Sequence, residues 1–191
     1  MADGPINLTN QFLIAMPGMV DENFAGTVVY LCEHSERGAL GLVINKPIDI
    51  RLRNLFEKVE LPLDRPDLAE QPVFFGGPVQ TERGFVLHES GDEPAPYSST
   101  MHVPGGLDMT TSKDVLEAMA NGGGPRRVLV TLGCSGWSAG QLEDEIGRNG
   151  WLTAPADPAV VFDTPVAQRY ERALGLLGFD PRMLSAQAGH A

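Results

Sequence analysis

The chain has few cysteines and no long apolar run, and each shortage excludes a class of protein. Two cysteines, Cys32 and Cys134, are too few for a disulfide framework, so reduced thiols in the cytoplasm are the simplest interpretation. No stretch reaches the roughly 18 apolar residues of a membrane-spanning helix. The first residues also lack the basic and apolar regions of a signal peptide. We therefore expect a cytoplasmic protein that does not associate with a membrane.

Basic residues are also scarce. The chain has 14 Lys and Arg against 25 Asp and Glu, and its formal net charge is −11. Non-specific affinity for nucleic acid comes mainly from Lys and Arg that neutralise phosphates, and the longest basic run is Arg126-Arg127. We therefore expect no direct binding of nucleic acid. The partner stays unknown, with a protein and a small molecule both open.

Short apolar runs separated by turn residues indicate many strands. The 22 glycines and 15 prolines predict tight turns and short elements. The runs rich in Val, Ile, Leu and aromatics, which predict buried strands, are Phe12–Met16, Thr27–Cys32, Leu40–Asn45, Val73–Phe75, Gly84–His88, Val128–Leu132 and Val160–Phe162. The link between 27–32 and 40–45 is too short for a parallel crossover, so it predicts an antiparallel hairpin. Similar spacing predicts a second hairpin, of 74–79 with 84–88.

Helical periodicity adds four helices to these strands. The first begins near Asp49 and ends at Leu61-Pro62, because its apolar residues recur on one face. A second helix covers 112–120. A third starts at Ser138 with a capping box, and a fourth runs from Thr164-Pro165 to Gly178. Residues 187–191 are expected to form a loose tail. The sequence predicts an α+β fold: a mixed, largely antiparallel sheet with packed helices, in a single domain over 1–191.

Several apolar runs end in residues that could bind a ligand, and we expect these residues to meet on one surface. They are Met16, Pro17, Cys32, His34, Asn45, Lys46, Gly76, Gly77 and Pro78. The glycines permit a close approach of the backbone to a ligand or to another strand. Lys46 could bind an anion, although a solvated lysine at a strand end is the simpler interpretation.

Cys32 allows two interpretations. Alternate residues of a strand share a face, so His34 could activate the Cys32 thiol as a nucleophile. Alternatively, Cys32 is a small core residue, as free cysteines commonly are. We favour the core interpretation, because no third residue is fixed in place to orient the histidine. The chain is therefore expected to have no catalytic residue. The alternative is an enzyme or redox protein that uses Cys32.

Metal, cofactor and anion sites have little support. His34, His88, His102 and His190 are scattered without the spacing of a metal site, so we predict no metal and no cofactor. The glycine-rich loop 132–141 precedes a helix, where backbone amides could hold an anion. It lacks a nucleotide-binding motif, and the acidic run 143–145 would repel phosphate. A tight turn with Trp137 packed over it is the favoured interpretation.

Blocks of residues along nearly the whole chain, from about Leu8 to Ala188, resemble the YqgE/AlgH family, also called UPF0301. The blocks are Phe12–Pro17, Tyr30–His34 with Gly41–Pro47, Phe75–Val79 with Gly84–His88, and Gly136-Trp137 with Gly140–Glu143 and Trp151-Leu152. The resemblance implies a bacterial cytoplasmic protein with a compact α+β fold and a smaller inserted subdomain, around 48–110. The family is largely uncharacterised, and one branch carries the label of a transcriptional regulator. The resemblance therefore implies a binding or regulatory module and supplies no catalytic residues.

Overall fold

The computed structural model describes residues 7–178, which form an α+β fold around one continuous sheet. Its strands are β1 (Gln11–Ala15), β2 (Val28–Ser35), β3 (Gly38–Val43), β4 (Pro47–Arg51), β5 (Pro72–Phe75), β6 (Val79–His88), β7 (Thr100–His102), β8 (Asp108–Thr110), β9 (Val128–Ser138) and β10 (Trp151–Pro155). Its helices are α1 (Leu52–Lys58), α2 (Pro66–Ala69), α3 (Asp114–Ala120), α4 (Gln141–Gly147), α5 (Pro158–Phe162) and α6 (Arg169–Gly175), with a 3₁₀ turn, η1, at Val166–Gln168. The expected fold class is thereby confirmed.

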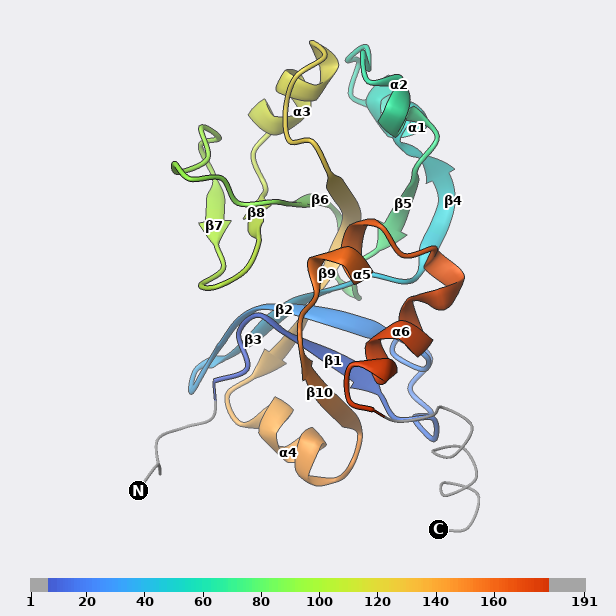
Figure 1. Ribbon diagram of the computed structural model, residues 1–191, viewed down its shortest axis with the longest axis vertical. Helices are drawn as coiled ribbons and strands as arrows, with labels where there is room; N and C mark the ends of the chain where they lie inside the picture. Colours follow the sequence, from blue (N-terminus) through green and yellow to red (C-terminus); the bar gives the residue numbers. More distant parts are fainter. Residues whose placement is uncertain (1–6, 179–191) are drawn as a thin grey trace.

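The long strand β9 joins the two halves of the molecule. Its first part lies between β5, which runs parallel to it, and β6, which runs antiparallel. Its last part pairs with β3 in the lower half. Figure 1 shows β1, β2, β3 and β10 below, with α4 beneath them, and β4 to β8 above with α1, α2 and α3 at the top. Whether residues 48–110 form a subdomain stays a prediction.

Three apolar clusters follow from this arrangement. One packs Phe12, Tyr30 and Leu87 with residues of α5 and α6, and a second lies under α1 and α3. The third packs Leu13, Leu31 and neighbouring side chains between the lower sheet and α4. Burial of each such side chain stabilises the fold by about 1.5–3 kcal/mol. The strand residues therefore alternate between cores on the two faces of the lower sheet.

Glu145 of α4 fixes two tryptophans of the third cluster. The indole N–H groups of Trp137 and Trp151 both donate to Glu145 Oε1, at 3.0 and 2.9 Å. Gln141 Nε2 donates to the other carboxylate oxygen at 2.9 Å. The two indole rings meet edge to face, with centroids 6.0 Å apart. One carboxylate therefore attaches α4 to both β9 and β10.

The hairpin of 27–32 with 40–45 is confirmed as the antiparallel pair β2–β3. The prediction of a second hairpin, of 74–79 with 84–88, is wrong. Strand β9 lies between β5 and β6, and each of the two pairs with β9 instead. The first helix begins at Leu52 rather than near Asp49, since residues 47–51 form strand β4. The helix expected from Ser138 begins at Gln141, whose side chain still accepts the Ser138 N–H at 3.0 Å.

The segment Val160–Phe162 is helical, not a strand. Asp157 caps α5 by accepting the Ala159 N–H, and Pro158 fills the first helical position. An Asp-Pro pair before an apolar run is a helix start signal, which outweighs the β-branched valines. The expected tail, 187–191, lies outside the described residues.

Candidate functional site

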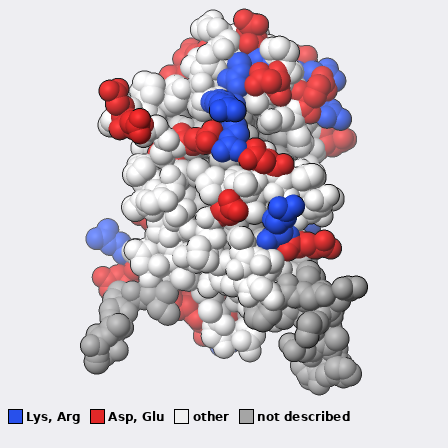
Figure 2. All heavy atoms as spheres, in the orientation of Figure 1, with Lys and Arg blue, Asp and Glu red and all other residues white. Residues whose placement is uncertain are grey.

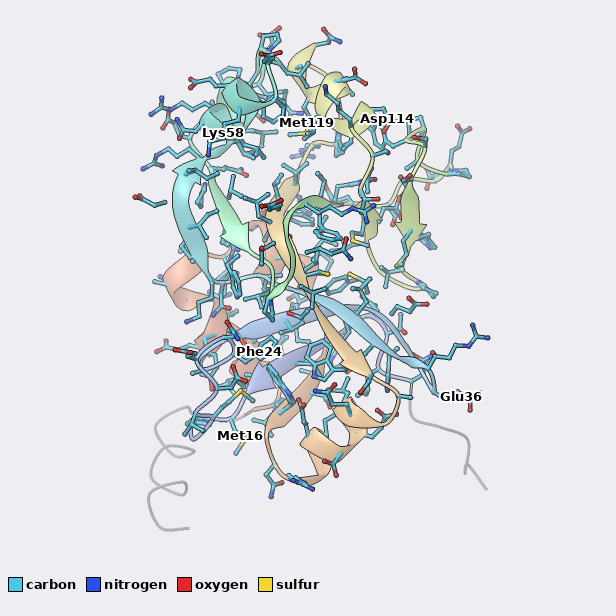
Figure 3. All side chains as sticks on the ribbon, turned by 180° about the vertical axis from the view of Figure 1, so that it is seen from behind. Met16, Phe24, Glu36, Lys58, Asp114 and Met119 are labelled. Carbon is cyan, nitrogen blue, oxygen red and sulfur yellow. The ribbon has the colours of Figure 1, made fainter. Side chains whose placement is uncertain are left out.

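The nine candidate residues from the sequence do not form one surface. Met16, Asn45 and Lys46 lie at one end of the lower sheet, whereas His34 lies at the other end of β2, about 20 Å along a strand of this length. Figure 3 shows this separation, with Met16 near Phe24 on one side and Glu36, in the β2–β3 turn, on the other. Cys32 and His34 are both buried.

A β-bulge separates Cys32 from His34. Leu31 pairs with Gly41 and Glu33 with Leu40, so Cys32 is the extra residue of the strand. The bulge reverses the alternation of faces. Cys32 packs in the first apolar cluster with Cys134, whereas His34 points to the opposite face, toward α4. The expectation that Cys32 and His34 could share a face is therefore wrong.

His34 has a structural environment. Its Nδ1 accepts the Leu8 N–H at 2.9 Å, and its Nε2 lies 3.4 Å from Glu143 Oε2. The first contact holds the N-terminal segment of the described chain against β2. Nothing in this arrangement directs His34 toward the Cys32 thiol.

The remaining candidates form turns and a strand crossing. Asn45 Oδ1 accepts the Val28 N–H at 2.9 Å and its Nδ2 donates to Gly26 O at 3.0 Å, which closes the end of β3 on β2. The Lys46 carbonyl accepts the Phe75 N–H at 2.8 Å. Pro17 and Pro78 are exposed in loops. The bond to Phe75 places Lys46 beside the start of the 76–78 loop.

Gly76 and Gly77 lie where the link from β5 to β6 crosses β9. A Cβ atom at Gly76 would lie 2.2 Å from Gly133 O, and one at Gly77 would lie 2.2 Å from Cys134 O. The close neighbour of these glycines is therefore another strand and not a ligand. Ser135 Oγ donates to Gly76 O at 3.0 Å and fixes the crossing.

Burial raises the pKa of Cys32 to about 12, and it also raises the pKa of Cys134. We therefore expect Cys32 in a Cys134→Ala variant to react with iodoacetamide at pH 7 at least 100-fold more slowly than free cysteine, whose pKa is about 8.5. The rate is measured by mass spectrometry on the native chain. The same variant in 8 M urea should react at the ordinary rate, and a native rate close to that of free cysteine would restore the thiol-enzyme hypothesis.

A better candidate site lies between the two halves, where β7 and the loop from β7 to β8 meet the last residues of β2. We call it the waist pocket. It is a cavity of about 510 Å³ lined by Asn7, Thr9, Cys32, Glu33, Met101, His102 and Pro104. This volume lies within the range of small-molecule sites. A hollow of about 570 Å³ beside the β2–β3 turn is lined largely by the turn itself, and its exposed side chains make it a weaker candidate.

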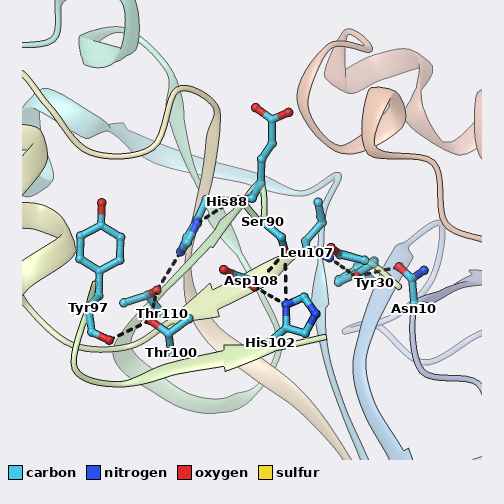
Figure 4. Close-up of polar contacts among 12 residues, drawn as sticks. Asn10, Tyr30, His88, Ser90, Tyr97, Thr100, His102, Leu107, Asp108 and Thr110 are labelled. Atoms are coloured by element: carbon cyan, nitrogen blue, oxygen red, sulfur yellow. Dashed lines mark hydrogen bonds and ion pairs between the residues drawn. The ribbon is translucent and has the colours of Figure 1, made fainter. Parts of the chain in front are cut away.

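His102 borders the waist pocket and is held by a buried carboxylate. Its Nδ1 lies 2.7 Å from Asp108 Oδ1, and Ser90 Oγ donates to the same oxygen at 2.8 Å. The side chain of His102 is 64% exposed and that of Asp108 is 5% exposed. Figure 4 shows the imidazole against Asp108 and Ser90. A carboxylate that fixes one nitrogen of a histidine also sets its tautomer, so the geometry presents Nε2 in a defined state.

This cluster is not a Ser-His-Asp triad. In a triad the serine bonds the histidine nitrogen opposite the carboxylate. Here Ser90 Oγ lies on the Asp108 side, 3.4 Å from His102 Nδ1, and its single proton is shared between Asp108 Oδ1 and Gly106 O. His102 therefore cannot activate Ser90, and the cluster orients a histidine instead.

The loop between β7 and β8 is fixed to the lower half by Tyr30 and Asn10. Tyr30 Oη donates to Asn10 Oδ1 at 2.9 Å and accepts the Leu107 N–H at 3.1 Å. Asn10 Nδ2 donates to Gly105 O at 3.0 Å. Figure 4 shows this chain of contacts beside Asp108. The pocket walls from the two halves are thereby held in a defined relation, which favours a preformed site.

His88 of β6 belongs to a second set of polar contacts, which it makes with Thr110 of β8. Its Nε2 lies 2.8 Å from Thr110 Oγ1, and its ring meets Tyr97 edge to face at 5.8 Å. Burial lowers the pKa of His88 below its ordinary value of 6.5. The folded state therefore holds this imidazole neutral where the unfolded chain is protonated.

This shift predicts a loss of stability in mild acid. Below pH 6.5 the unfolded state binds more protons at His88 than the folded state does. The free energy of unfolding therefore decreases as the pH is lowered, by at most about 1.4 kcal/mol per pH unit. Urea unfolding from pH 7 to 5 should show a steeper fall for the native chain than for a His88→Gln variant. Equal slopes for the two proteins would contradict the prediction.

Sequence reasoning missed Asp108, Ser90 and Tyr30 as parts of a site. Asp108 and Ser90 lie in polar segments without a motif, and only the pairing of β8 with β6 and β7 brings them together. The signal that the sequence offers is His102, a histidine outside any metal-site spacing. Among residues 7–178 no group of His, Cys, Asp and Glu is arranged to hold a metal ion.

The surface and helices give two further observations. On the face in Figure 2, basic and acidic side chains intermix over the upper half and no broad patch of one sign forms. Within the described part of the chain, every helix is too short or too polar to cross a bilayer.

Comparison with known proteins extends these observations. A model of the AlgH-like family matches residues 12–182. A UPF0301 protein of Ralstonia nicotianae is 69% identical over 189 residues, covering 99% of this chain and 98% of that protein. A UPF0301 protein of a Polaromonas species is 70% identical, covering 97% and 96%.

Solved structures agree with the sequence matches. The solution structure of AlgH from Pseudomonas aeruginosa is 49% identical, with a TM-score of 0.78 over 100% of both chains. A crystal structure of a protein from Corynebacterium diphtheriae is 22% identical, with a TM-score of 0.68 over 88% of this chain and 86% of that one, and shares the fold. The resemblance seen in the sequence blocks is confirmed: the chain belongs to the AlgH-like family of UPF0301 proteins.

Proposed function

We propose that this chain is a binding and regulatory module whose ligand or partner occupies the waist pocket. The observation that supports the proposal most is the fixed His102, an exposed imidazole oriented by a buried carboxylate at the rim of a cavity. Exposed side chains that are held in one orientation are typical of recognition sites. The hydrogen bonds of Tyr30 and Asn10 add a pocket shape that needs little ordering on binding.

A thiol enzyme fits the chain less well. Cys32 borders the waist pocket, but it is 2% exposed and its raised pKa leaves the thiol protonated at neutral pH. His34 lies on the other face of the sheet. The two free, buried cysteines agree with the cytoplasmic location that is part of this proposal.

The regulatory role would operate through a protein or a small molecule and not through direct contact with DNA. The net charge of −11 opposes affinity for phosphates. A mobility shift on random duplex DNA at 150 mM salt tests this part, and we expect no shift at micromolar protein concentrations.

A ¹⁵N-detected NMR screen of the labelled chain against small molecules tests the pocket itself. Ligands should shift the backbone N–H signals of Thr9 and of 101–107 apart from Pro104, and His102→Gln should weaken ligand binding. Glu36→Gln, a change in the exposed β2–β3 turn outside the waist pocket, is the matched control. Ligands that map elsewhere and bind His102→Gln as well as the native chain would exclude the waist pocket as the binding site.

A further inference from the structure

The charges around the waist pocket indicate which ligands it takes. Glu33 is the one carboxylate among the described residues that line it, and none of those residues is Lys or Arg. Arg37 borders the neighbouring hollow at the β2–β3 turn, which Glu33 also lines. The pocket therefore offers a negative group to a ligand and no positive side chain of the Lys or Arg type.

His102 adds a second acceptor. A carboxylate oxygen without a proton can only accept, so the 2.7 Å contact with Asp108 Oδ1 places the imidazole proton on Nδ1. Ser90 Oγ lies 2.8 Å from the same oxygen. The Nε2 atom of a neutral His102 then carries a lone pair directed away from Asp108, at the exposed edge of the ring.

The other walls of the pocket are apolar in part. Met101 and Pro104 line it beside the buried sulfur of Cys32, whereas Asn7 and Thr9 contribute amide and hydroxyl groups. A ligand that fits both parts has a hydrogen-bond donor with a positive charge and an apolar stem. Anions with the same stem would meet Glu33 without a compensating base.

From these contacts we propose that the waist pocket binds an aliphatic ammonium or guanidinium group. The inference rests on the proposed function, since it names the ligand class of the same pocket. Glu33 binds the positive charge, His102 Nε2 accepts an N–H, and Met101 with Pro104 packs against the methylene stem. The group is carried either by a small amine or by a Lys or Arg side chain of a partner protein.

The test uses three probes with one stem and different heads: n-pentylamine, 1-pentanol and pentanoate. We expect ¹⁵N NMR titrations of the full chain to show saturable shifts at 101–107 for the amine, weaker shifts for the alcohol and none for pentanoate. A blocked Gly-Lys-Gly peptide and its norleucine counterpart distinguish the two sources. Tighter binding of the lysine peptide than of pentylamine indicates a protein partner, and the reverse indicates a small amine.

Two variants assign the binding to the named residues. Glu33→Gln should lower the affinity for pentylamine by about two- to five-fold, which is the contribution of a solvent-accessible ion pair. His102→Gln should lower this affinity as well, and Glu36→Gln should leave the affinity unchanged. Equal binding of amine and alcohol, or preferred binding of pentanoate, overturns the inference. If ligands of another class still map to the pocket in the NMR screen, the proposed function stands, and if no ligand maps there, both fail.

Discussion

The variant Gly77→Ala should lose about 4 kcal/mol or more of unfolding free energy, or fail to fold. Gly77 has a φ of +150°, which L side chains rarely adopt, and its new Cβ would lie 2.2 Å from Cys134 O and 2.4 Å from Ser135 Oγ. The backbone atoms of β9 cannot move away, because Cys134 pairs with Val79 of β6 and Ser135 pairs with Gly41 of β3 at this crossing. Urea unfolding followed by far-UV circular dichroism measures the loss.

Gly84→Ala is the matched control. Gly84 lies on β6, and a Cβ there meets no atom within 4 Å. Its unfolding free energy should stay within about 0.5 kcal/mol of the native value. If Gly77→Ala folds with a loss below 1 kcal/mol, the crossing is looser than the distances imply, and its glycines would again be available to a ligand.

The variant Glu145→Ala should cost about 2–4 kcal/mol. Trp137 and Trp151 are 6% and 2% exposed, and both indole N–H groups would lose their common acceptor. A buried donor left without a partner costs about 1–3 kcal/mol. We expect α4 to loosen from the sheet, which near-UV circular dichroism of the two tryptophans should detect together with a lower urea midpoint.

Two controls separate the carboxylate from the helix that bears it. Glu145→Gln keeps an oxygen that accepts both indole groups and should cost about 1 kcal/mol, the value of a neutral hydrogen bond. Asp144→Ala removes an exposed pair with Arg148 and should change stability by less than about 0.5 kcal/mol. An equal loss for Glu145→Gln and Glu145→Ala would show that charge, and not the hydrogen bonds, attaches α4.

Much of the fold could be predicted from the sequence. Short apolar runs such as 12–16 and 27–32 indicate burial directly, and the short link that contains Gly38 leaves only an antiparallel pairing. The three-residue strands β7 and β8 could not be found, because segments so short and polar have no periodicity to read. The insertion of β9 between β5 and β6 is a non-local pairing, and local spacing favours the wrong hairpin.

The site could be predicted less well. The sequence places Cys32 and His34 two positions apart, but it contains no sign of the bulge that separates them. Asp108 and His102 are six positions apart in a segment without a motif. Their contact depends on the register of β7 on β8, which the chain fixes through the distant anchors Tyr30 and Asn10.

The sharing of β9 between the halves has a consequence for hydrogen exchange. Its amides bond to β3 at one end and to β5 and β6 at the other, so neither half can open alone without breaking this strand. Amides in the middle of β9 should therefore exchange only through global unfolding, and their protection should equal the full free energy of unfolding. The AlgH-like chain would then unfold as one cooperative unit despite its two-part shape.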